Sequence, residues 1–143
     1  MYYVAKLTRE GRHWLVEFPD CPGCQTFGES KNEALEMAAD CLAGWLASTL
    51  KHGELPRVPR SRTGRGMVPV PVPARLAAIV TIRLRRAELG LTQKQLAARL
   101  GVSQQQVAKL EDPDTNSSLE SIEKAMQALG IRLEFVAEPD SQS

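Results

Sequence analysis

Residues 91–111 read LTQKQLAARLGVSQQQVAKLE, and their spacing predicts two short helices joined by a tight turn. Gly101 lies between the two helices, where a helix end favours a residue that tolerates a positive φ. Apolar residues recur at helical spacing on both sides of it. These residues are Leu96, Ala97, Leu100, Val107 and Leu110. Two short helices joined by a glycine-containing turn have the geometry of a helix-turn-helix.

Each predicted helix also carries a start signal. Thr92 lies three residues before Gln95, and Ser103 lies three residues before Gln106, which is the spacing of a capping box. The size, turn and cap requirements of a helix-turn-helix are therefore met together. The alternative interpretation is a plain α-hairpin within a helical domain, without a role in nucleic-acid binding.

The polar residues of the second helix indicate DNA binding. In a helix-turn-helix this helix enters the major groove, and its N-terminal residues meet the base edges. Gln104 and Gln105 occupy those positions, and a glutamine amide matches the N6 and N7 groups of adenine. We expect the Gln106 side chain to be occupied by its own capping box. The alternative for each glutamine is solvated helix surface.

Two further residues are expected to hold the DNA backbone. Gln93 opens the first helix, where its amide and the helix's first N–H groups could bind a phosphate. Lys109 lies further along the second helix and suits a phosphate contact better than a base contact. The complete predicted DNA-binding set is Gln93, Ser103, Gln104, Gln105 and Lys109.

This stretch resembles the helix-turn-helix of lambdoid phage repressors and their bacterial relatives. The resemblance extends over residues 73–136 once the flanking helices are counted. We predict one flanking helix over Ala74–Glu88, and another that is capped by Ser117 and runs to about Leu129. The resemblance implies an all-α DNA-binding domain at residues 73–137.

The end of the chain alternates apolar and polar residues over Ile131–Val136, which predicts a short strand. All other predicted strands lie far away in the sequence, so this strand is expected to pair with its copy in a second subunit. Ile131, Leu133 and Phe135 would then form a homodimer interface, and a dimer would match a palindromic operator. Residues 138–143 are predicted to be disordered.

The first half of the chain has a different pattern. Alternation over residues 2–8 and 13–18 predicts a β-hairpin, and residues 25–27 a short third strand. A long amphipathic helix is predicted over Ser30–Lys51, with Glu33 three residues after the cap. Together these elements predict a small sheet with one covering helix.

Residues 51–72 connect the two halves. The segment 51–66 contains the run PRVPRSRTGRG and is predicted to be an exposed basic loop. The following MVPVPVP alternates valine with proline, and proline cannot donate a ladder hydrogen bond. We therefore assign it as a fourth strand at the edge of the N-terminal sheet. The alternative is a polyproline linker.

The N-terminal half resembles HicB-type antitoxins. The matching residues are Phe18-Pro19-Asp20, Pro22-Gly23-Cys24, Thr26, Gly28, Glu29 and the EALEMA at Glu33–Ala38. The resemblance covers residues 1–72 and implies an α+β chain whose β-β-β-α-β first domain is partly RNase H-like. It also implies a partner, a small mRNA-cleaving HicA-like toxin. We expect the toxin to contact the turn region, through Phe18, Asp20, Gln25 and Phe27.

Composition excludes several classes of protein. The chain is 43% hydrophobic and 24% charged, which is ordinary for a globular protein. It contains no apolar run near the roughly 20 residues that span a bilayer. Its start lacks an apolar signal core, so a cytoplasmic protein is expected. The net charge of +1 is uneven, with +4 on residues 51–66, +4 on residues 67–112 and negative charge at both ends. The basic half is the expected phosphate-facing part.

The cysteines raise the question of a metal or redox site. Cys21 and Cys24 form a C-x-x-C, but a second half of a zinc site is missing, and Pro22-Gly23 indicates a turn. Cys41 lies in the predicted long helix. Incidental thiols at a β-turn are the expected reading, with a metal or redox role as the alternative. We predict no metal and no cofactor.

Three functions remain to be compared. The first is an antitoxin that inhibits its toxin and represses its own operon, acting as a homodimer or larger oligomer. The second is a stand-alone repressor with a sensory N-terminal domain. The third is an enzyme, since RNase H chemistry is carried by carboxylates that converge on metal ions. Glu17, Asp20 and Glu29 form no such cluster in the sequence pattern, so we expect neither catalytic residues nor an enzyme.

Overall fold

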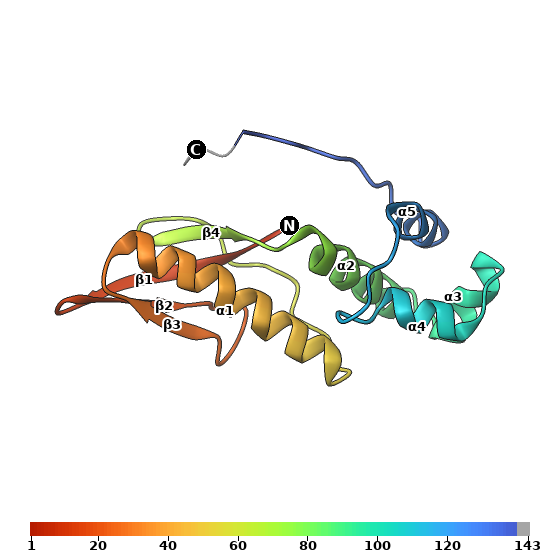
Figure 1. The fold of residues 1–143 in the computed structure, drawn as a ribbon, viewed down its shortest axis with the longest axis horizontal. Helices are drawn as coiled ribbons and strands as arrows, with labels where there is room; N and C mark the ends of the chain where they lie inside the picture. The colour runs from red at the N-terminus through yellow and green to blue at the C-terminus, as the bar shows by residue number, and fades with distance from the viewer. Residues whose placement is uncertain (140–143) are drawn as a thin grey trace.

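The computed structural model describes residues 1–139 and shows an N-terminal antiparallel sheet with one long helix, followed by four shorter helices (Figure 1). This mixed α+β architecture confirms the predicted fold class at that level. The elements are β1 (Tyr2–Glu10), β2 (His13–Glu17), β3 (Gln25–Gly28), α1 (Lys31–Lys51), β4 (Met67–Pro71), α2 (Ala74–Glu88), α3 (Gln93–Leu100), α4 (Gln104–Leu110) and α5 (Leu119–Ala128). No helix in this described part is long and apolar enough to cross a membrane.

The sheet has the order β3-β2-β1-β4, and all of its neighbouring strands are antiparallel. β4 pairs only with β1, with Tyr3 opposite Val70, so the predicted edge strand is confirmed and the polyproline alternative is wrong. An edge position suits Pro69 and Pro71 because only one side of the strand needs N–H donors.

Helix α1 covers one face of the sheet (Figure 1). Its buried residues recur every four positions and pack against Tyr3, Val16 and Val70. They are Ala34, Ala38, Leu42, Leu46 and Leu50. The start of α1 lies so close to β3 that a Cβ on Gly28 would sit 2.5 Å from the backbone nitrogen of Ala34. Only glycine allows this approach, which the sequence motif did not explain.

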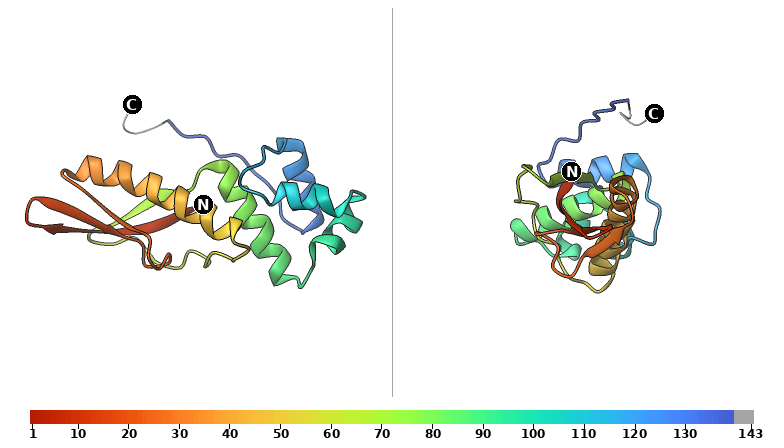
Figure 2. Two further views of the ribbon diagram at one scale, coloured as in Figure 1. Left: turned by 60° about the horizontal axis from the view of Figure 1, so that its bottom comes forward. Right: turned by 90° about the vertical axis from the view of Figure 1, so that its left-hand side faces the viewer.

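The predicted exposed loop between α1 and β4 is held down along its backbone. The Asp20 carboxylate accepts hydrogen bonds from the backbone N–H groups of Arg60 (3.0 Å) and Ser61 (2.9 Å). The Tyr3 hydroxyl donates to the Arg57 carbonyl at 2.7 Å. In Figure 2 this loop runs alongside the sheet, from the end of α1 to the start of β4. Its arginine side chains are exposed. The loop backbone is therefore attached to the N-terminal unit although its charged side chains face solvent.

Helix α2 belongs to two hydrophobic cores. Leu76, Ile79 and Val80 lie in the core between the sheet and α1. Ile82 lies in a second core with α3, α4 and α5. The predicted boundary at residue 72/73 therefore does not separate two independent cores, because the same helix fills part of each.

The predicted C-terminal strand is not confirmed. Residues 131–136 form no strand in the single chain, since a strand needs a hydrogen-bonded neighbour and the described part of the chain offers none. Ile131 and Leu133 pack against the second core, whereas Phe135 is 71% exposed. The cap of α5 is Ser118 and not Ser117, because the Ser118 hydroxyl accepts from the Ser121 N–H. Of the predicted tail, residues 140–143 lie outside the described residues.

Candidate nucleic-acid and partner interfaces

Helices α3 and α4 form the predicted helix-turn-helix. Both capping boxes are present, with Thr92 and Ser103 each accepting the N–H three residues on, at 3.1 and 3.2 Å. Gly101 adopts φ +69° at the end of α3, as its position in the sequence predicted. The turn geometry was therefore predictable from residue types alone.

The apolar residues fix the rotation of α4. Val107 is completely buried and Leu110 packs against the same core, which also contains Leu96, Ala97 and residues of α5. With this face turned inward, Gln104, Gln105 and Lys109 are exposed. The Gln106 oxygen accepts the N–H of Ser103 at 3.2 Å, so its side chain is occupied, as expected. The exposed first turn of α4 can present two glutamine amides to a groove.

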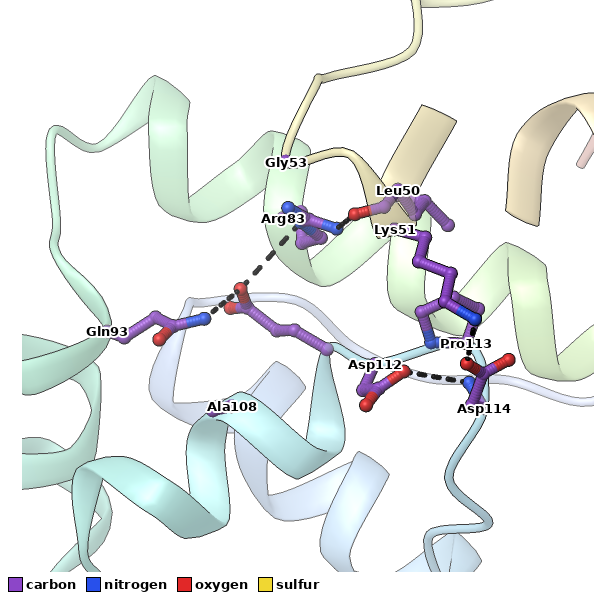
Figure 3. A pocket seen from close by; sticks show the side chains of 10 residues that line it. Leu50, Lys51, Gly53, Arg83, Gln93, Ala108, Asp112, Pro113 and Asp114 are labelled. Atoms are coloured by element: carbon purple, nitrogen blue, oxygen red, sulfur yellow. Dashed lines mark hydrogen bonds and ion pairs between the residues drawn. The ribbon is translucent and has the colours of Figure 1, made fainter. Parts of the chain in front are cut away.

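A buried ion pair lies at the C-terminal end of α4, and it was not predicted from the sequence. Glu111, at the end of α4, is only 2% exposed. Its two oxygens accept from Nε and Nη2 of Arg86 at 2.7 and 2.8 Å, in a bidentate pair. Gln93 Nε2 also donates to Glu111, at 3.1 Å (Figure 3). Gln93, which was predicted to hold a phosphate, therefore donates its side-chain hydrogen bond to the residue at the C-terminal end of α4.

Arg83 extends this network to the N-terminal unit. Its Nη1 donates to the Leu50 carbonyl at the end of α1 at 2.7 Å, and its Nε lies 3.8 Å from Glu111 (Figure 3). Burial lowers the pKa of Arg83, against the opposing effect of Glu111. A second ion pair, Lys51 with Asp114 at 2.6 Å, is exposed on both sides. These residues line a pocket of about 270 Å³. Most of its charged groups pair with one another, but the buried Nε of Arg83 has no hydrogen-bond partner among the described residues.

The predicted toxin-contacting residues are placed in different settings. Phe18 is 3% exposed and belongs to the core, so its ring cannot be offered to a partner. Asp20 anchors the loop, and these backbone hydrogen bonds outweigh the effect of burial and lower its pKa. Gln25 is exposed, and Phe27 is 62% exposed. The motif alone could not distinguish a core aromatic from a surface one.

Phe27 is the centre of a surface on the sheet face opposite α1. It lies directly across from Leu15 of β2, and its ring makes an edge contact with His13 at 5.9 Å between centroids. Gln25 points to the same face by alternation along β3. We call His13, Leu15, Gln25 and Phe27 the β3 surface. It is a half-apolar patch at the edge of the sheet.

Ile131, Leu133 and Phe135 line a groove of about 910 Å³ together with α2 and α5. The segment that carries them runs back from α5 towards β4 (Figure 1). Among the described residues, no group of three or more His, Cys, Asp and Glu side chains is placed to hold a metal ion.

Comparisons with known proteins agree with this two-part organisation. Residues 2–66 match the model of the HicB_like antitoxin of bacterial toxin-antitoxin systems, and residues 82–136 match a helix-turn-helix model. The chain is 31% identical to antitoxin HicB 2 of Photorhabdus laumondii over 137 residues, which are 96% of each chain. The chain belongs to the HicB antitoxin family. It is also 28% identical to antitoxin HicB of Escherichia coli K12, over 86% of this chain and 88% of the relative.

A solved HicB structure is also similar. The antitoxin HicB from Burkholderia pseudomallei matches with a TM-score of 0.46 and 17% identity, over 71% of this chain and 93% of the other. Membership of the HicB family together with a helix-turn-helix domain indicates an antitoxin that binds DNA. It points to a regulator and not to an enzyme.

Proposed function

We propose that this HicB-family protein inhibits a small mRNA-cleaving, HicA-like toxin with its N-terminal unit and represses its own operon with its helix-turn-helix. The single observation that supports this most is the α4 surface. Its buried face and both capping boxes leave Gln104 and Gln105 exposed on the first turn, at the end that enters a groove. The family match supplies the antitoxin half of the proposal.

In the proposed complex, Gln104 and Gln105 read bases and Lys109 holds a phosphate. Gln93 keeps its bond to Glu111, and a second phosphate lies at the start of α3, where the first backbone N–H groups point outwards. Ser103 acts as the cap that orders the first turn of α4. The positive charge of residues 67–112 favours the approach to DNA.

The β3 surface is the proposed contact for the toxin. Phe27 is a large exposed aromatic residue on an edge strand, and such residues are enriched at interface centres. Gln25 lies beside it, whereas Asp20, in the turn before β3, holds the loop of residues 51–66 through the N–H of Ser61. Phe18 contributes only through the core beneath.

A homodimer is the proposed DNA-binding form. Ile131 and Leu133 lie a few residues after α5, and Phe135 is exposed to solvent. The backbone of this segment has no strand partner within residues 1–139. Pairing of this segment with a second copy would satisfy those backbone groups. It would also place two α4 helices for the half-sites of a palindrome.

DNA reading is tested with a panel of operator variants at several salt concentrations. Gln105→Ala should lose roughly 1–3 kcal/mol of discrimination at one base pair, because one bidentate contact is removed. Lys109→Ala should weaken binding to all sequences alike and lower the salt slope by about one charge. Unchanged base preference in both Gln104→Ala and Gln105→Ala would show that base reading lies elsewhere.

Toxin inhibition is tested by rescue of cells that express the product of the adjacent reading frame. Phe27→Asp should abolish rescue, since it places a charge at the centre of the apolar contact. Met37→Asp is the matched control, because Met37 is an exposed apolar residue on α1, away from the β3 surface. Both variants should still bind operator DNA, which reports folding. Full rescue by Phe27→Asp would remove the β3 surface from the proposal, and no co-purification of that product would favour a stand-alone repressor.

A further inference from the structure

The three cysteines are arranged differently from what the C-x-x-C spacing implies. Cys24 does not face its sequence neighbour Cys21 but Cys41 of α1, with 3.4 Å between the two sulfur atoms. Cys41 lies 16 residues from Gln25, whose carbonyl also lies 3.6 Å from its sulfur. All three thiols are reduced in the structure. The close pair therefore joins the turn before β3 to the helix that covers it.

Both members of this pair are held by well-defined backbone. Cys24 closes a turn in which its N–H donates to the Cys21 carbonyl at 2.9 Å, and its carbonyl accepts from Phe18 at 3.2 Å. Cys41 lies in the middle of the 21-residue helix α1. Sulfur atoms 3.4 Å apart are in contact, so either thiol is placed to attack the other once one of them is oxidised.

We propose that Cys24 and Cys41 are an oxidation site, at which a peroxide converts the two thiols into an intramolecular disulfide. Cys41 is the entry point because it is half-buried, whereas Cys24 is 3% exposed. The Cys41 sulfur attacks the peroxide, so that an S–O bond forms, the O–O bond breaks and water leaves. The Cys24 sulfur then attacks the Cys41 sulfenic acid, the S–S bond forms, and a second water leaves. Two thiols lose two electrons and two protons, which the peroxide takes up.

The surroundings set the rate of this reaction. Burial raises the pKa of the Cys24 thiol, and contact with Cys41 raises it further. Burial likewise raises the pKa of Cys21, to about 12, which keeps this third thiol protonated and unreactive. Because the thiolate is the attacking form, the step in which Cys24 attacks should be slow at neutral pH and faster in alkaline buffer. The disulfide would link the turn before β3 covalently to α1.

The test is peroxide treatment of the full chain, followed by thiol counting under denaturing conditions and mass spectrometry. The wild-type chain should fall from three titratable thiols to one and lose two hydrogen atoms per monomer. Cys21→Ala is the matched control and should fall from two thiols to none. Cys41→Ala should keep both of its thiols. Cys24→Ala should form no intramolecular disulfide and should instead carry an added oxygen on Cys41, because no second thiol is in contact with it. Circular dichroism checks that every variant is folded.

Several outcomes would overturn the proposal. Three remaining thiols in the treated wild type would show that the pair does not react. An added oxygen on Cys41 without loss of the Cys24 thiol would show simple over-oxidation. An intramolecular cross-link in Cys24→Ala would assign the reaction to Cys21 instead. None of these results depends on DNA or toxin binding, so the oxidation site and the proposed function are tested separately.

Discussion

At the scale of single residues, some side chains meet partners three positions away in the chain, whereas Glu111 meets a partner 25 positions away. The capping residues Thr92 and Ser103 were identified because their partners lie three positions away in the chain. Glu111 was missed because Arg86 is 25 residues distant, and nothing in the local pattern shows that the two meet. Phe18 and Phe27 were grouped together for the same reason, although one is buried and the other exposed.

The buried ion pair should make a large contribution to stability. Glu111→Gln leaves Arg86, whose side chain is 18% exposed, without its charge partner. Removal of one member of a buried pair typically costs about 3–5 kcal/mol. Glu88→Gln is the control, since Glu88 pairs with Arg85 of the same helix but is 69% exposed, and such pairs contribute about 0–1 kcal/mol. Urea denaturation measures both, and equal losses would contradict the role assigned to burial.

Asp20 should make the stability of the N-terminal unit depend on acid pH. Its pKa in the folded chain is below the ordinary value, so its contribution is fully present above the unfolded pKa of about 4. That contribution is lost as the pH falls through the folded pKa. Asp20→Asn keeps an acceptor oxygen for Ser61 but cannot titrate. Thermal melts between neutral and acid pH should therefore show a shallower acid dependence for this variant than for wild type.

At the scale of elements, almost every helix and strand could be predicted from periodicity, caps and breakers. The edge strand β4 followed from its prolines, because they leave only one hydrogen-bonded side. The strand at residues 131–136 is not formed in the single chain, since alternation predicts a pleat but the predicted neighbour is a second copy. Close contacts between elements, such as β3 against α1, carry no local signal at all.

Two glycines of the N-terminal unit, one in β3 and one in α1, should respond in opposite ways to alanine. Gly28→Ala should destabilise the chain by about 1–3 kcal/mol, because the new Cβ meets the backbone of Ala34 and α1 must move. Gly44→Ala should stabilise it by about 0.5–1 kcal/mol, because Gly44 lies inside α1 with open space around it. Chemical denaturation of the two variants checks the signs, and a tolerated Gly28→Ala would contradict the close packing.

At the scale of the whole molecule, the sequence predicted two halves but not how they are joined. The composition of residues 51–66 predicted an exposed basic loop, yet Asp20 holds the backbone of this loop, and Arg83 donates a hydrogen bond to the Leu50 carbonyl at the end of α1. The contacts involved lie 33 to 41 residues apart along the chain. Long-range contacts of this kind depend on the final packing, so they cannot be predicted from the local pattern of residues along the chain.

The proposed dimer can be tested without disturbing the fold. Phe135→Ser changes a side chain that is 71% exposed, so the monomer should stay as stable as the wild type. Analytical ultracentrifugation should show a shift from dimer to monomer, with weaker binding to a two-half-site operator. Truncation before residue 131 is less suitable, because Ile131 and Leu133 also pack against the monomer's own core. A dimeric Phe135→Ser would place the interface elsewhere.

The shared helix α2 limits how relatives of this protein can exchange their halves. A recombination event in the proline-rich stretch would join the sheet of one relative to the α2 of another. The positions of Leu76, Ile79 and Val80, which fill the core of the sheet, would then carry residues that did not evolve with that sheet. A crossover after Gly90 would keep that helix with its own sheet and transfer α3–α5 as one piece. Relatives that have acquired a new operator preference should therefore show recombination breakpoints after α2, although the change in composition along the chain lies before α2.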